Sequence, residues 1–138
     1  MEDLRVRDVM SADVTTLQRN DKLTLADDIM RLGRIRHLPV IDENGQLAGI
    51  VTQRDLFRGA LAKALGYGER AQRQLMDTLL VKEVMTSDVI TTSPDTLLAD
   101  AAGVLVERKI GCLPVVDSGS LIGIVTEGDF VALAARKK

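Results

Sequence analysis

Residues 49–55 read Gly-Ile-Val-Thr-Gln-Arg-Asp, and residues 123–129 repeat this stretch as Gly-Ile-Val-Thr-Glu-Gly-Asp. In both copies a short apolar run leads directly into a polar segment. Threonine is a favourable N-cap residue, and an acid three residues later completes a variant of the capping box. Each copy therefore predicts a strand that runs straight into a capped helix.

The rest of the chain repeats around this motif. Residues 6–14 (VRDVMSADV) align with residues 81–89 (VKEVMTSDV), and residues 38–42 (LPVID) align with residues 113–117 (LPVVD). Two copies of one pattern predict a pair of related half-domains rather than a solenoid. We expect a first repeat over residues 1–66, a polar helical connector over 67–80 and a second repeat over 81–138.

Each repeat has the predicted order of strand, helix, hairpin and second helix. In the first repeat Thr24 and Asp27 form a cap signature, and Leu25, Ile29 and Leu32 recur at helical spacing as an apolar stripe. Asn44 and Gly45 are a strong hairpin signal. The predicted segments are 14–17, 24–33, 38–42, 47–52 and 52–66 in the first repeat, and 89–92, 97–108, 113–117, 121–126 and a helix from 129 in the second.

The composition excludes several classes of function. The 138 residues include 18 basic and 20 acidic side chains, so the net charge of −2 does not favour nucleic acid, and two Phe and one Tyr are too few for base stacking. No apolar run approaches the roughly 20 residues that span a bilayer. Cys112, the single cysteine, is expected to be a small buried apolar residue. We expect a cytoplasmic protein that does not insert into membranes.

The paired LPVxD strands and G-I-V-T-x-x-D turns resemble a tandem cystathionine-β-synthase (CBS) domain pair, also called a Bateman module. This resemblance covers nearly the whole chain. It implies an α/β (α+β) fold in which two repeats, related by a pseudo-twofold axis, pack through their sheets. It also implies two clefts between the repeats that bind adenosine-containing ligands, and a homodimer.

The resemblance assigns the ribose of such a ligand to Asp55 and Asp129, with Thr52 and Thr126 beside it. Thr16 and Thr91, at equivalent places in the first strands, are candidates for the side of the cleft that holds the base. A carboxylate can accept hydrogen bonds from two hydroxyls, as a vicinal diol requires. The alternative is that both motifs only cap helices.

A local cluster of bases in the first repeat predicts phosphate binding. Arg36 and His37 precede the LPV strand, and Arg54 directly precedes the motif aspartate, which agrees with the resemblance. The second repeat has Gly111-Cys112 and Glu127-Gly128 at the corresponding places. We therefore expect the two clefts to differ in affinity. Because the resemblance places each cleft between the repeats, these bases could serve a nucleoside anchored by Asp129 as well as one anchored by Asp55, and they could also be ordinary surface residues.

No enzymatic constellation is visible. The sequence lacks a Walker-type loop, a G-x-G-x-x-G fingerprint and a nucleophile elbow. His37 and Cys112 are repeat equivalents, but two ligands do not make a zinc site, so no metal is expected. Asp27, Asp28 and Asp100 are interpreted as acids in the first turns of helices, where they favour the helix dipole.

These observations predict a regulatory module, not an enzyme, that requires no cofactor. Its candidate ligands are AMP, ADP, ATP, S-adenosylmethionine and NAD, and ligand binding would shift its conformation for a regulated protein that the sequence does not identify. The alternative is a constitutive dimerisation or scaffold module that binds no small molecule.

Overall fold

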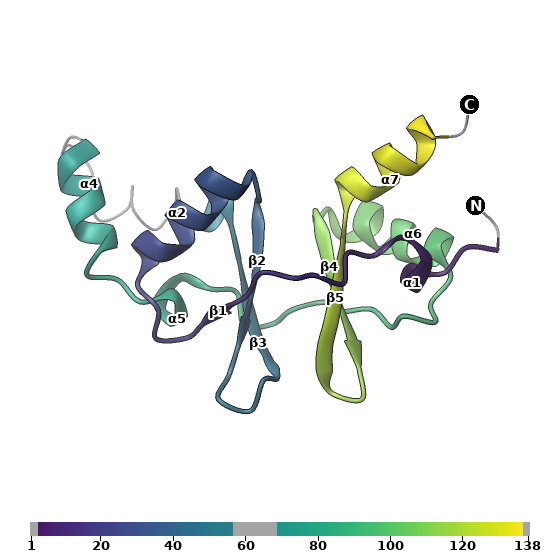
Figure 1. Ribbon diagram of the computed structural model, residues 1–138, viewed down its shortest axis with the longest axis horizontal. Helices are drawn as coiled ribbons and strands as arrows, with labels where there is room; N and C mark the ends of the chain where they lie inside the picture. The colour runs from purple at the N-terminus through teal and green to yellow at the C-terminus, as the bar shows by residue number, and fades with distance from the viewer. Residues whose placement is uncertain (1–2, 57–68, 137–138) are drawn as a thin grey trace. The chain divides into compact units, whose positions relative to one another are not determined.

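A computed structural model describes residues 3–56 and 69–136 of the chain (Figure 1). The described elements are mixed α and β, and both repeats contain strands and helices, which confirms the predicted fold class. Residues 53–56 are helical. The remainder of the helix predicted over residues 52–66 lies outside the described residues.

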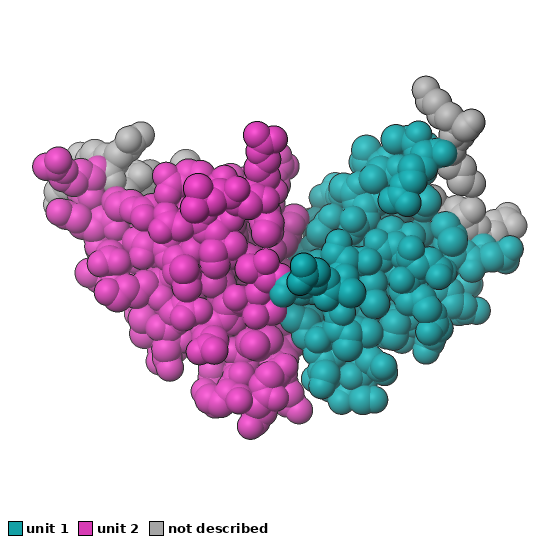
Figure 2. All heavy atoms as spheres, viewed as in Figure 1, with its two compact units in different colours: residues 1–14, 90–138 teal, residues 15–89 magenta. Residues whose placement is uncertain are grey.

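The chain divides into two compact units, coloured separately in Figure 2. Unit 1 consists of residues 1–14 and 90–138, and unit 2 consists of residues 15–89. Unit 1 therefore combines the beginning of the first sequence repeat with most of the second. Repeats and compact units are thus different divisions of the same chain.

Unit 2 is built on a three-stranded sheet in the order β1-β2-β3. β1 (Leu17–Gln18) is parallel to β2 (His37–Ile41), and β2 is antiparallel to β3 (Leu47–Thr52). In the hairpin loop the Asp42 carboxylate accepts hydrogen bonds from the backbone N–H groups of Asn44 and Gln46, and Gly45 has a φ of 78°. Glycine adopts this left-handed conformation without a steric penalty. The hairpin predicted from Asn44-Gly45 is confirmed.

Helix α2 (Leu23–Gly33) begins earlier than its predicted cap. Lys22 is the N-cap residue, and the Thr24 hydroxyl donates a hydrogen bond to Asp77, so the predicted Thr24–Asp27 cap is wrong. The predicted apolar stripe is wrong at Leu25 and Leu32, which are 43% and 84% exposed, whereas Ile29 packs against the core of unit 2. The buried face consists of Leu23, Ala26 and Met30. Ala26 is fully buried on this face.

Two further helices complete unit 2. The connector forms α4 (Glu69–Met76), which confirms a polar helix there, and α5 (Val81–Val84) follows it. Met76, Leu79 and Val81 are buried in the same hydrophobic cluster as the sheet and α2. The connector therefore contributes to the core of unit 2.

Unit 1 repeats this plan with a smaller sheet. Its strands β4 (Cys112–Asp117) and β5 (Ser120–Thr126) form an antiparallel pair, accompanied by α1 (Val6–Val9), α6 (Leu98–Arg108) and α7 (Glu127–Ala135). At the place of β1, Thr92 makes only an isolated parallel bridge to Val115. The strands predicted over 14–17 and 89–92 are therefore shorter than expected. Thr92 is half-buried, whereas its equivalent Leu17 is buried and anchors β1 in the core.

The leading segment of each sequence repeat packs with the body of the other repeat. The Val6 N–H donates to the Thr96 carbonyl at 2.9 Å, and the equivalent Val81 N–H donates to the Asp21 carbonyl at 2.8 Å. In Figure 1 the purple α1 accordingly lies beside the green α6. Residues from both repeats are thus needed to complete either unit.

This exchange requires glycine at two equivalent strand positions. A Cβ on Gly49 would lie 2.7 Å from Met85 Sδ and 2.8 Å from the Thr86 carbonyl oxygen. A Cβ on Gly123 would lie 2.7 Å from Met10 Sδ and 3.0 Å from the carbonyl oxygen of Ser11. The first glycine of the G-I-V-T motif therefore makes room for the leading segment that crosses its strand.

Candidate functional site

The two motif turns have the same backbone framework, one in each unit. Thr52 ends β3 opposite His37, and Thr126 ends β5 opposite Cys112. The backbone N–H that follows each threonine forms a hydrogen bond across the hairpin. In unit 2 the Gln53 N–H donates to the Arg36 carbonyl at 2.9 Å. The Glu127 N–H donates to the Gly111 carbonyl at 3.0 Å. Residues before the LPV strand are therefore held beside the start of each motif helix.

Both predicted caps are present. Asp55 Oδ2 accepts from the Thr52 N–H at 2.9 Å, and the Asp55 N–H donates to Thr52 Oγ1 at 3.2 Å. In unit 1, Asp129 Oδ2 accepts from the Thr126 N–H at 2.8 Å, and the Thr126 hydroxyl lies 3.4 Å from the same oxygen. The T-x-x-D pattern thus positions the carboxylate as well as beginning the helix.

Each motif carboxylate retains one oxygen for other partners. Both side chains are half-buried, and their Oδ2 atoms accept the capping bonds. Among the described residues, neither Asp55 Oδ1 nor Asp129 Oδ1 has a hydrogen-bond partner. A carboxylate held by its cap with a further oxygen available can accept hydrogen bonds from a bound hydroxyl.

The side chains around the turn of unit 2 are basic. Arg54 and Arg36 are exposed, and within the described part of the chain neither guanidinium has an ion-pair partner. His37 is half-buried beside Thr52 in the strand register. The structure therefore brings Arg36, His37, Thr52, Arg54 and Asp55 to one end of the β2–β3 hairpin.

The turn of unit 1 lacks these bases. Gly111 and Gly128 occupy the places of the two arginines, and Glu127 is exposed in the first turn of α7. Cys112 is 6% exposed, and burial raises the pKa of its thiol to about 12. The prediction of a buried apolar cysteine is confirmed, and its high pKa makes the thiolate nucleophile scarce at neutral pH.

The two threonines predicted to face the base lie farther from the turns. Thr16 is half-buried immediately before β1, and Thr91 is exposed immediately before the bridge residue Thr92. In unit 2 the strand β2 lies between β1 and β3. Two strand spacings amount to about 10 Å, so Thr16 and Thr52 are not in direct contact across the sheet.

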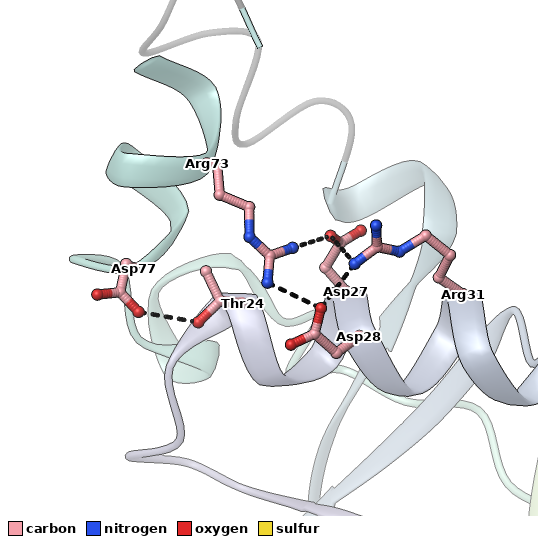
Figure 3. A network of polar contacts seen from close by, with 6 residues as sticks. All are labelled: Thr24, Asp27, Asp28, Arg31, Arg73 and Asp77. Carbon is pink, nitrogen blue, oxygen red and sulfur yellow. Dashed lines mark hydrogen bonds and ion pairs between the residues drawn. The ribbon is translucent and has the colours of Figure 1, made fainter. Parts of the chain in front are cut away.

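A polar network that the sequence did not predict joins α2 and α4 (Figure 3). Arg73 donates to Asp27 Oδ2 and to Asp28 Oδ1, both at 2.8 Å, and Arg31 donates to Asp28 Oδ1 at 2.7 Å. The hydrogen bond from Arg73 lowers the pKa of Asp28, and the same bond raises the pKa of Arg73. Residues 45 or more positions apart carry no local signal of such pairing.

The network corrects one interpretation of the acids. Asp27 and Asp28 do not lie in the first turn of α2, which begins at Leu23, so they serve as ion-pair partners rather than dipole acids. Asp100 does lie in the first turn of α6, as predicted.

The part of the chain that the structure describes has neither a cluster of metal ligands nor a helix suited to crossing a membrane. No group of three or more His, Cys, Asp or Glu side chains there could hold a metal ion. None of its helices is both long enough and apolar enough to cross a bilayer.

The family model described as CBS domain matches residues 6–62 and residues 81–136. The solved structure of AcuB from Vibrio cholerae has a TM-score of 0.82 and 37% identity, covering 96% of this chain and 90% of that one. The CBS domain pair of MJ0100, in complex with 5′-methylthioadenosine and S-adenosyl-L-methionine, has a TM-score of 0.79 and 33% identity, covering 98% of each chain.

A third solved structure, CBSX2 in complex with AMP, has a TM-score of 0.78 and 32% identity, covering 96% of each chain. The first three curated relatives are longer proteins, and the chain spans 25%, 42% and 34% of their lengths at 32%, 30% and 33% identity. The first of these relatives is an enzyme, most of which lies outside the matched region.

Proposed function

The chain belongs to the CBS domain family, and we propose that it is a regulatory module that binds adenosine-containing small molecules at its two threonine–aspartate turns. Two similar CBS-type structures, at 33% and 32% identity, hold AMP or the adenosyl compounds 5′-methylthioadenosine and S-adenosyl-L-methionine. AMP, ADP, ATP, S-adenosylmethionine and NAD are the candidate ligands for this chain. The module catalyses no reaction of its own in this proposal.

One observation carries the proposal. One carboxylate oxygen of each motif aspartate accepts the capping hydrogen bond. No described residue forms a hydrogen bond with the other carboxylate oxygen. A cap alone does not require that second oxygen, whereas a ribose diol does. We assign the ribose to Asp55 and Asp129, with Thr52 and Thr126 orienting them. Arg36, His37 and Arg54 bind phosphate, and Thr16 and Thr91 face the base.

The ligand acts by shifting the population of conformers that a partner protein recognises. A ligand at 100 times its Kd stabilises the state that it binds by about 2.7 kcal/mol. A ligand that binds one conformer only can therefore offset much of the difference of a few kcal/mol that separates two conformers.

Calorimetric titration with the five candidate ligands tests the proposal. Asp55→Asn and Asp129→Asn keep an oxygen for the capping bond but remove the negative charge. Because hydrogen bonds to charged groups contribute about 1.5–3 kcal/mol, each variant should weaken binding at its turn by roughly 10-fold or more. Asp42→Asn, in the hairpin loop of unit 2, is the matched control. Absence of binding by every ligand in the panel would refute the proposal.

Dimerisation is a second candidate function, favoured by exposed apolar side chains in unit 1. Val106 on α6 is 78% exposed and Val131 on α7 is 69% exposed. We propose that such residues contribute to a homodimer. Sedimentation equilibrium with and without ligand distinguishes the two functions: a dimer that forms equally in both conditions, in a protein that binds no ligand, would identify a constitutive scaffold.

A further inference from the structure

We infer that the two turns divide their ligands by charge: the turn of unit 2 takes a phosphorylated adenosine, and the turn of unit 1 takes an adenosine derivative without phosphate. This inference rests on the proposed function, because it assigns a ligand class to each of the proposed sites. It makes Arg54 and Gly128 the residues that determine specificity.

The parts that hold the nucleoside are the same in both units. The capping bonds to Asp55 and Asp129 measure 2.9 and 2.8 Å, and the bonds across the hairpin measure 2.9 and 3.0 Å. Both carboxylates are half-buried. A difference in ligand preference must therefore arise from the side chains that surround this common framework.

In unit 2 those side chains include two cations that form no ion pair with any described residue. Arg19, Arg31 and Arg73 each form ion pairs with carboxylates. Arg36 and Arg54, in contrast, have no ion-pair partner among the described residues. Guanidinium groups bind phosphate through paired hydrogen bonds. Arg54 directly precedes Asp55, and the Arg36 carbonyl accepts the Gln53 N–H at 2.9 Å, so both arginines belong to the turn that would hold the ribose, and phosphate is a partner that suits them.

In unit 1 the positions equivalent to Arg36 and Arg54 do not favour phosphate binding. Gly128 and Gly111 offer no cation, while Glu127 adds a second carboxylate to the first turn of α7 beside Asp129. Two negative side chains repel an added anion. A neutral adenosyl compound, or one with a positive sulfonium group, meets no such repulsion.

Nothing in the fold requires glycine at position 128. It is not among the described residues with a positive φ, and an added Cβ would lie 3.6 Å from Thr126 Oγ1, an ordinary contact distance. The choice of glycine here is thus free to reflect the ligand, and an arginine can be introduced without backbone strain.

The test uses AMP and 5′-methylthioadenosine, which share the nucleoside and differ in bearing a phosphate or a methylthio group. Calorimetry on the full chain is run in Asp55→Asn and Asp129→Asn backgrounds to observe one turn at a time. We expect Asp55→Asn to weaken AMP binding and Asp129→Asn to weaken 5′-methylthioadenosine binding, each by about 10-fold or more.

The charge is then moved between the turns. Arg54→Gln should weaken AMP binding by about 10-fold, whereas Arg70→Gln, the same change on α4, should not. In the Asp55→Asn background, Gly128→Arg should strengthen AMP binding by about 10-fold. Thermal melts monitor folding, and Gly128→Lys supplies the cation if Gly128→Arg does not fold.

Three outcomes are distinguishable. Gain of AMP binding with Gly128→Arg and its loss with Arg54→Gln would establish the division. AMP binding that depends on Asp129 but not Asp55, or that is indifferent to both charge changes, would overturn the division while the proposed function stands. Failure of the wild-type protein to bind either compound, or any other candidate ligand, would refute the proposed function itself.

Discussion

Units 1 and 2 have similar residues at equivalent core positions but different residues at equivalent surface positions. Leu98, Leu113 and Val115 of unit 1 are as fully buried as their equivalents Leu23, Leu38 and Val40 of unit 2. On the outer helix, however, Asp27, Asp28 and Arg31 of α2 correspond to Ala102, Gly103 and Val106 of α6. Close packing restricts the core to one solution, whereas exposed positions tolerate change at little cost. The surface is therefore where two copies of one fold can acquire different tasks.

The largest expected effect tests whether the two cores are equivalent. Leu23→Ala and Leu98→Ala should each lower the free energy of unfolding by about 2–5 kcal/mol, because each leaves a cavity under a fully buried helix start. Urea denaturation measures both. The control Leu32→Ala, at an 84% exposed position, should change stability by less than about 0.5 kcal/mol. Costs that differ by more than about 2 kcal/mol would show that the cores are not matched.

The next effect concerns the crossing segments. Gly49→Ala and Gly123→Ala should each destabilise the protein by about 1–3 kcal/mol through overpacking. The cost should be greater at Gly49, because the opposing carbonyl oxygen is 2.8 Å from the added Cβ rather than 3.0 Å. Chemical denaturation compares them with Gly103→Ala, which meets no atom within 4 Å and should stabilise α6 by about 0.5–1 kcal/mol. A neutral result at both crossing sites would contradict the exchange of leading segments.

A smaller effect, of opposite sign, is expected where α2 and α6 end. Arg34 and Lys109 adopt left-handed conformations with φ of 55° and 57°. Replacing either by glycine should relieve this strain and stabilise the protein by about 0.5–1 kcal/mol. Thermal melts should show similar gains for the two variants. Gly45→Ala, with a φ of 78°, is the reverse control and should lower the melting temperature.

The smallest expected effect is on hydrogen exchange near the α2–α4 network, which is present in unit 2 and not among the described residues of unit 1. Arg73→Gln should speed hydrogen exchange in α4 while leaving α6 unchanged, because unit 1 has no equivalent ion pairs among its described residues. Solvent weakens such exposed pairs, so the effect on global stability should be slight. Exchange measured by mass spectrometry provides the test, and equal acceleration in both helices would contradict a local role.

The same network should contribute to the free energy of unfolding in a way that depends on pH. Arg73 lowers the pKa of Asp28 in the folded protein. A carboxylate with a lowered folded pKa stabilises the native state above its unfolded pKa, and this contribution is lost as the pH falls through the lowered value. The difference between wild type and Arg73→Gln should therefore be present at neutral pH and disappear in acid. A difference that grows in acid would contradict this assignment.

Local patterns predicted the elements better than they predicted the pairing of distant residues. The hairpin at Asn44-Gly45 and the caps at Thr52 and Thr126 follow from interactions within a few residues, and both are present. The Thr24 cap was mistaken because Asp77, a distant residue, binds that hydroxyl instead. Propensity describes a segment by itself and contains no information on which distant group will satisfy a side chain.

The sequence alone determined the repeat, the order of elements, the two matched turns and the difference in charge between those turns. Each of these features follows from short patterns of neighbouring residues. Tertiary structure decided that Met10 packs on Gly123 and Met85 on Gly49, and that Arg73 joins α4 to α2. These features depend on close packing and hydrogen-bond geometry between groups that only the folded chain brings together.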